Sequence, residues 1–201
     1  DHQSPAVHHI AHAINAKLGS IGTAVTYTES PEAGCCDHND SLKDLTDSLN
    51  NGQVQAVIIV GGNPAFNAPS DLKFGEAIKK AQFRVRLSLF DDETSALCNW
   101  TVAETHFLEA WGDLRGHDGT VSIVQPLIAP LYPDSHSSLD LLNSLFESPR
   151  SGYDLVRDTH RSSGADFEKN WEKWLNDGVV SGSSLPTINV TVAPVPPSVS
   201  S

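Results

Sequence analysis

The sequence is poor in basic residues and in cysteine, and each shortage argues against a class of protein. The 13 Lys and Arg stand against 25 Asp and Glu among 201 residues, which gives a formal net charge of -12 at pH 7. Nucleic acids and anionic membranes are bound by clustered cations that displace counterions, so we expect no nucleic-acid partner. The 3 cysteines are too few for a disulfide scaffold or a four-thiolate iron-sulfur site.

Long apolar runs and the common catalytic motifs are missing as well. The longest apolar run is far short of the roughly 20 residues that a membrane helix needs, so we expect no direct membrane insertion. The GxGxxG, HExxH and GxSxG patterns do not occur, and no catalytic residue is expected. The sequence contains no Met, and we expect a processed chain or a piece of a larger protein.

What is present is an alternation of strand and helix patterns. Residues 54–60 (VQAVIIV) are apolar on both faces, which predicts a buried central strand of a parallel sheet, so that Ile59→Ala should cost roughly 2–5 kcal/mol. Ser70 is a candidate N-cap for a helix over 72–81, and residues 83–90 alternate as a second strand. This order predicts the α/β class. Further expected elements are helices at 5–18, 42–49, 93–100, 137–146 and 167–175, strands at 23–27 and 187–192, and an extended segment at 119–131.

The turn Gly61-Gly62-Asn63-Pro64 follows the first of these strands, where open α/β sheets bind ligands. Glycine lets a backbone approach a phosphate or ribose closely, although many sheets use such a turn only structurally. Asp91-Asp92-Glu93 follows the second strand. These carboxylates could accept hydrogen bonds from a ribose or a guanine edge. Alternatively, they could cap the N-terminus of the next helix. The residue types alone leave both interpretations open.

Two other groups of residues invite a chemical interpretation. His8 and His12 have the i, i+4 spacing of a metal pair, but no third ligand is indicated, so a solvated helix face is the simpler interpretation and no metal site is expected. The residue types of Glu104, His106 and Glu109 would suit acid-base catalysis, but the sequence does not fix their geometry. A structural role is therefore favoured. We expect Val57 to Val60 to be buried and Cys35-Cys36 to lie in an exposed loop.

Longer segments of the sequence resemble a known family. "INAKLGSIG" (14–22), "GGNPAFNAPSD" (61–71), "DETSALC" (92–98), "THFLEAWGD" (105–113) and "DGTVSIVQPLIAPLY" (118–132) follow one another in the order found in the dimethyl-sulfoxide-reductase type of molybdopterin oxidoreductases. "GYDLVRD" (152–158) and "WLNDGVVSGSSLP" (174–186) extend the similarity to one branch, the molybdopterin-oxidoreductase-like iron-sulfur subunit of bacterial alternative complex III, a quinol:electron acceptor oxidoreductase.

The resemblance implies a fold and a site. The fold is a Rossmann-like three-layer sandwich with a mostly parallel sheet over residues 1–193, followed by a Pro/Ser-rich tail at 194–201. In the superfamily the corresponding turn and loop line a molybdopterin guanine dinucleotide. The residues that match those positions here are Gly62, Asn63, Pro64, Asp92, Glu93 and Thr94.

Departures from the family pattern imply that this site is vestigial. Asp92 replaces a Thr and brings a negative charge toward the cofactor's phosphates. Asn99 and Ala103 replace the Asp and Pro of an "ADVVLP" segment, and the bulky Trp100 replaces a small β-branched residue. These differences match the branch, whose molybdopterin-like part holds no cofactor.

The expected role is therefore a non-catalytic scaffold domain of a respiratory iron-sulfur subunit. It would contact other domains and subunits of a membrane-bound electron-transfer complex at the periplasmic face of the bacterial inner membrane. Iron-sulfur clusters would lie elsewhere in the parent subunit, and this piece would hold no cofactor. The alternative is a fragment of an active molybdenum oxidoreductase that binds the guanine dinucleotide. A third hypothesis is a free-standing nucleotide-binding protein.

Overall fold

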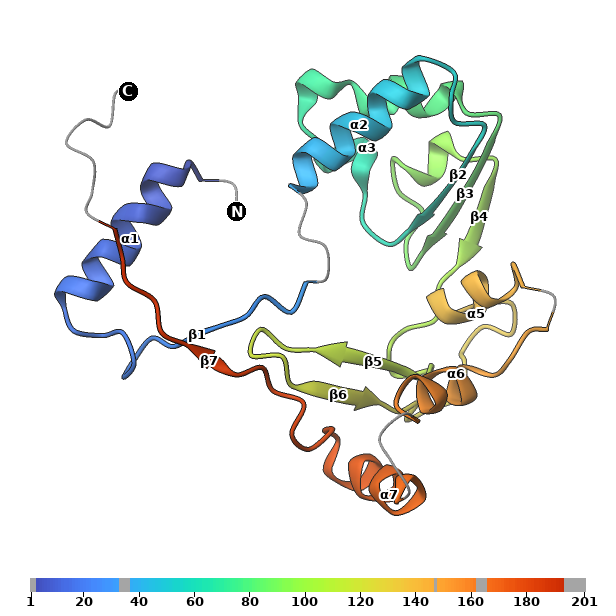
Figure 1. The fold of residues 1–201 in the computed structure, drawn as a ribbon. Coiled ribbons are helices and arrows are strands. Elements are labelled where there is room, and N and C mark those ends of the chain that lie inside the picture. The colour runs from blue at the N-terminus through green and yellow to red at the C-terminus, as the bar shows by residue number, and fades with distance from the viewer. Residues whose placement is uncertain (1–2, 33–36, 147, 162–165, 194–201) are drawn as a thin grey trace. The chain divides into compact units, whose positions relative to one another are not determined.

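The computed structural model describes residues 3–32, 37–146, 148–161 and 166–193 (Figure 1). The chain divides into two compact units. The first comprises Asp1–Ala33, Arg115–Val121 and Ser181–Ser201, and the second comprises Gly34–Leu114 and Ser122–Val180. Cys35, Cys36 and the expected tail lie outside the described residues. The expected division into a domain at 1–193 and a tail stays a prediction.

The second unit contains a parallel sheet of three strands, which confirms the α/β class. The strands β2 (Ala56–Val60), β3 (Phe83–Ser88) and β4 (Trp100–Ala103) lie in the order β2-β3-β4, and both pairings are parallel. The prediction that β2 is the central strand is wrong. The central strand is β3, because residues 100–103 add a strand on its other side, where the sequence pattern predicted the end of a helix.

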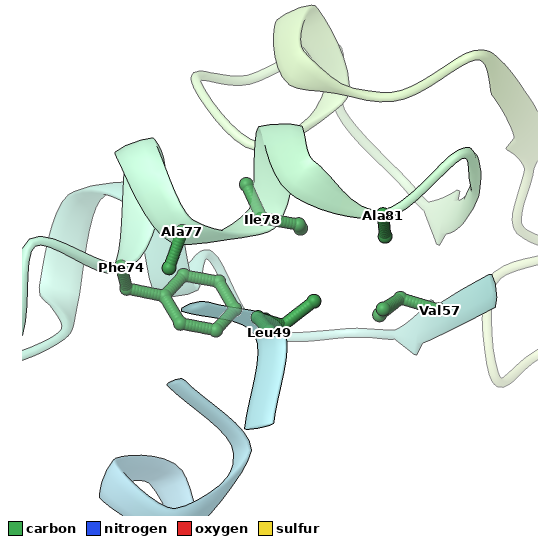
Figure 2. Packing of buried hydrophobic residues seen from close by; sticks show 6 residues of the cluster. All are labelled: Leu49, Val57, Phe74, Ala77, Ile78 and Ala81. Atoms are coloured by element: carbon green, nitrogen blue, oxygen red, sulfur yellow. The ribbon is translucent and has the colours of Figure 1, made fainter. Parts of the chain in front are cut away.

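The two faces of this sheet differ in their cover. Val57 is buried beneath α2 (His38–Asn50), α4 (Phe74–Ala77) and the 3-10 helix η2 (Ile78–Lys80), as Figure 2 shows. Ile58 and Val60 point to the other face, since side chains alternate along a strand. They are 39% and 41% exposed, so the expected burial of residues 57–60 holds for Val57 and fails for these two. The cluster in Figure 2 consists of Leu49, Val57, Phe74, Ala77, Ile78 and Ala81.

Local sequence explains how these helices begin and break. Helix α2 begins at His38, earlier than predicted, because the Asp37 carboxylate accepts hydrogen bonds from the amides of Asn39 and Asp40 at 2.8 and 3.2 Å. The predicted helix over 72–81 is broken into η1 (Ser70–Leu72), α4 and η2. The break lies at Lys73, whose φ of 51° is left-handed. Ser70 makes no capping hydrogen bond.

The rest of the second unit forms a smaller, aromatic core. The short helix η3 (Ser95–Leu97) precedes β4, and β5 (Gly112–Arg115) pairs with β6 (Val121–Val124). Helices α5 (Ser138–Asn143), α6 (Gly152–Thr159) and α7 (Phe167–Asp177) follow, and α7 ends as predicted at a left-handed Gly178. The buried residues of this core are Ile123, Val156, Phe167, Trp171 and Trp174.

The first unit contains α1 (Pro5–Lys17), which confirms the predicted helix. The predicted strands at 23–27 and 187–192 are much shorter, because only β1 (Tyr27–Thr28) and β7 (Thr187–Ile188) pair, in antiparallel fashion. A turn stands before β1, where the Ser20 carbonyl accepts hydrogen bonds from the amides of Thr23, Ala24 and Val25. In the part of the chain that the structure describes, no helix has the length and apolarity to cross a membrane.

Gly119→Ala should loosen the first unit locally. Gly119 has a φ of +82°, and an added Cβ would lie 2.8 Å from the backbone nitrogen of Leu185, whose amide donates to the Asp118 carbonyl at 2.8 Å. Overpacking of this kind costs about 1–3 kcal/mol. Hydrogen exchange of the Leu185 amide should accelerate accordingly. Gly182→Ala is the matched control, because its φ is +76° and its added Cβ meets nothing within 4 Å. Equal acceleration in both variants would show that backbone strain alone is responsible.

Candidate functional site

The turn after β2 has an open backbone. Gly61 and Gly62 have φ values of +64° and +62°, which glycine adopts without strain, and an added Cβ at either position would meet nothing within 4 Å. The Gly61 amide donates to the Leu87 carbonyl at 3.1 Å and so continues the pairing of β2 with β3. Pro64 then opens the short helix α3 (Pro64–Asn67). The turn is thus anchored to the central strand on one side and to a helix on the other.

The structure brings Asn63, Glu93 and Thr94 together. The Thr94 hydroxyl donates to Asn63 Oδ1 at 2.7 Å and accepts from the Ala65 amide at 3.0 Å. Asn63 Nδ2 donates to Glu93 Oε2 at 2.7 Å. Thr94 is fully buried. The amide oxygen and amide nitrogen of Asn63 and the hydroxyl of Thr94 therefore all have partners within the chain.

A buried arginine in β3 donates hydrogen bonds to the same turn. The sequence analysis did not predict this residue. Arg86 is 1% exposed. Its guanidinium donates to the Gly61 carbonyl at 2.5 Å, to the Gly62 carbonyl, and to Asp92 Oδ2 at 2.6 Å. The available signal was a basic residue in the interior of an apolar strand with acidic residues just beyond the strand's end, since a buried arginine needs a paired charge.

Asp92 has a structural role in this network. Its Oδ1 accepts hydrogen bonds from the amide and hydroxyl of Ser95 at 2.9 and 3.1 Å, in agreement with the capping interpretation. Burial raises the pKa of the Asp92 carboxyl, but the bonds from Ser95 and Arg86 outweigh it and leave the pKa below its ordinary value. Because Arg86 neutralises this charge, the expected repulsion of cofactor phosphates is weaker than the sequence suggested.

The pH dependence of stability should report the Asp92 pairing. With its pKa lowered in the folded state, Asp92 contributes stability that is complete above about pH 3.9 and is lost as the pH falls through the folded pKa. The difference in unfolding free energy between the native chain and Asp92→Asn should therefore shrink as the pH falls from about 6 toward 3. Urea unfolding at several pH values measures it. A constant difference would show that the Asp92 pKa is not shifted by folding.

Trp100, one of the departures from the family pattern, lies away from the turn. It opens β4, and its register partner in β3 is Val85, which in turn pairs with Ile58. Its side chain therefore shares the open face of the sheet with Ile58, where it is 64% exposed. The amino end of a parallel strand lies at the opposite edge from the turn. The bulk of Trp100 therefore does not reach the turn.

The other candidate residues make structural contacts. His12 Nδ1 lies 2.7 Å from the Tyr27 hydroxyl. Glu109 is buried, and its carboxylate accepts hydrogen bonds from the amides of His106 and Leu131 at 2.9 and 3.2 Å, so it joins two loops. Across the described residues, no three His, Cys, Asp or Glu side chains are grouped so that they could hold a metal ion.

Comparison with known proteins adds no relative. No protein-family model matches the chain, and no curated protein matches it. The family resemblance therefore stays a hypothesis based on the sequence segments quoted above, and the six candidate residues stay predicted site residues whose mutual contacts are now described.

Proposed function

We propose that the chain is a non-catalytic scaffold domain of the iron-sulfur subunit of a respiratory quinol:electron acceptor oxidoreductase, with a vestigial dinucleotide site. It belongs to a parent subunit at the periplasmic face of the bacterial inner membrane and contacts the cluster-bearing domain and partner subunits. The family assignment rests on the sequence resemblance. The scaffold role rests on the contacts within the turn.

The observation that carries the scaffold role is the use of the turn's polar groups by the chain itself. Asn63 bonds both Thr94 and Glu93, and the carbonyls of Gly61 and Gly62 accept hydrogen bonds from Arg86. A dinucleotide would have to break these bonds to gain its own, and an exchange of equivalent hydrogen bonds contributes little affinity. The network therefore favours a structural turn over a ligand site.

The open face of the sheet supports packing against other domains. Ile58, Val60 and Trp100 are exposed on it in the described chain. A Rossmann-like three-layer sandwich carries helices on both faces of its sheet. In the proposed parent, the second layer would come from the remaining domains of the subunit and would cover these side chains.

Analysis of metal and nucleotide content tests the proposal. The chain would be expressed in a host that makes the cofactor, purified, and assayed for molybdenum, tungsten, iron and extractable guanine nucleotide. We expect that the chain contains none of these metals and no guanine nucleotide in stoichiometric amount. We also expect that the molybdopterin-like part of the full subunit holds none of them. Thr94→Val serves as a control, because it should lower stability by about 0.5–1.5 kcal/mol without changing nucleotide content. Stoichiometric guanine dinucleotide that disappears in Thr94→Val would overturn the proposal.

The alternative, a cofactor-binding fragment of an active molybdenum oxidoreductase, is favoured by one observation. A Cβ added at Gly61 or Gly62 would meet no atom within 4 Å, so there is space for a ligand to approach the backbone closely. Under this alternative, Gly62→Ala would abolish cofactor retention. A free-standing nucleotide-binding protein would instead bind GTP saturably without molybdenum, and a flat titration would dismiss that hypothesis.

A further inference from the structure

A cavity of about 400 Å³ lies beside the carboxyl ends of β3 and β4. Leu89 lines it just after β3 ends, and Glu104 to Phe107 line it just after β4 ends. The loop that leads to β5 (Figure 1) and the start of α5 complete the lining. The volume is in the range of small-molecule sites, and carboxyl edges of parallel sheets are where such sites form. None of the six dinucleotide-site candidates contributes to it.

Glu104 brings a partly buried carboxylate to this cavity. Among the described residues, no hydrogen bond reaches its carboxylate. Burial raises the pKa of Glu104, while the charge of Arg86 lowers it by less. Arg86 is already bonded to Asp92. The second carboxylate of the lining, Asp113, lies 2.8 Å from His160 Nε2 and so has a partner. Glu104 thus has no directly bonded counter-charge among the described residues.

Thr105 contributes a buried hydroxyl to the wall of the same cavity. It lines the cavity and is 8% exposed, and its Oγ1 is buried without a hydrogen-bond partner in the described part of the chain. Its backbone is fixed, because its amide donates to the His136 carbonyl at 3.1 Å. Buried hydroxyls are normally bonded, so this unbonded hydroxyl in the cavity wall is an exception among the described residues.

The remaining lining suits a positive charge on an apolar body. Trp111 and Phe107 contribute aromatic rings, and Leu89 and Leu114 contribute aliphatic surface. Trp111 packs edge-on against Tyr153, with ring centroids 4.9 Å apart, which holds it in place. No Lys or Arg is found among the lining residues that the structure describes. Aromatic rings and a carboxylate together attract a cation, most strongly where water is excluded.

We propose that this cavity binds an organic cation, a primary ammonium or guanidinium group on an apolar body. Its charged group pairs with Glu104, and its body lies against Trp111 and Phe107. The site is separate from the turn, so this inference does not depend on the scaffold proposal.

Titration of the intact chain with small probes tests the inference by NMR. The probes are 2-phenylethylammonium, the neutral 2-phenylethanol, the anionic 3-phenylpropionate and blocked arginine amide. We expect saturable shifts of the Trp111 indole and of the amides of 104–107 with at least one cation, about tenfold tighter than with the alcohol. Tighter binding of the amine indicates a free small cation, and tighter binding of blocked arginine indicates a side chain of a partner protein. Equal or weaker binding of both cations than of the alcohol overturns the proposal.

Three variants separate binding from folding. Glu104→Gln should abolish the preference for cations over the alcohol. Thr105→Val should leave both cation binding and stability nearly unchanged, since its hydroxyl has neither accessible surface nor a hydrogen bond in the described part of the chain. Glu76→Gln is the matched control, because it removes an exposed carboxylate outside the cavity and should leave binding unchanged. Cation binding that persists undiminished in Glu104→Gln refutes the assigned role of this carboxylate and with it the proposal.

Discussion

Replacing Arg86 with Met is expected to lower the unfolding free energy by about 3–5 kcal/mol, the cost of removing one partner from a buried ion pair. Arg86 is 1% exposed and is bonded to the carbonyls of Gly61 and Gly62 and to the Asp92 carboxylate. Methionine fills a similar volume but donates no hydrogen bond, so it leaves the carboxylate and both carbonyls without these donors. Urea unfolding monitored by tryptophan fluorescence measures the loss.

Two further variants identify the cause of that loss. Arg86→Lys keeps the positive charge but loses the planar fork that reaches both carbonyls, so its cost should fall between those of the native chain and Arg86→Met. Lys79→Ala removes an exposed pair, in which Lys79 Nζ lies 2.9 Å from Glu76 Oε1, and should cost less than about 1 kcal/mol. A loss of that small size in Arg86→Met would show that the network is dispensable for folding.

Arg86 also illustrates what the sequence predicts and what it leaves out. Residues 83–90 were correctly predicted to form a strand from their alternation, and the alternation itself implied one less buried face. In the structure, Val85 to Ser88 are all buried, and these four residues alternate between the two faces of β3. The periodicity of a strand shows which positions are polar. It does not show that one of them, Arg86, is buried and paired with the carboxylate of Asp92.

The position of β2 at the edge of the sheet was missed for a related reason. An apolar run on both faces predicts cover on both faces, but it does not say which part of a protein supplies that cover. Helices of the second unit cover Val57, whereas Ile58 and Val60 are exposed in the described chain. The strand that the sequence pattern missed is β4, because its four residues are too few for periodicity to distinguish a strand from the end of a helix.

The candidate site residues come from the family resemblance, and their role as a site stays a prediction. The structure shows that the two loops that carry them are in contact, through hydrogen bonds from Asn63 to Glu93 and from Thr94 to Asn63. Each pairing within them depends on side-chain direction, which sequence spacing does not fix. The carboxylate of Glu93 therefore bonds Asn63, and that of Asp92 turns to Arg86.

Ile78→Ala is expected to lower the unfolding free energy by about 2–5 kcal/mol. Ile78 is 0% exposed within the cluster that joins α2 and η2 to the sheet, so its loss leaves a cavity among Leu49, Phe74 and their neighbours (Figure 2). Ile59, for which the sequence predicted the same cost, is only partly buried, and about 1–2 kcal/mol is expected instead, since less apolar area is lost. Urea unfolding of both variants checks the order.

Ile58→Ala is the control that connects this stability series to the scaffold proposal. Ile58 has the same side chain on the same strand, but it lies on the open face and is 39% exposed, so its truncation should cost less than about 1 kcal/mol in the chain alone. If other domains of the parent subunit cover this face, the same change should cost more in the full subunit, because a half-exposed side chain becomes a buried one. An equal, small cost in both contexts would mean that the open face of the sheet is not where the domain packs.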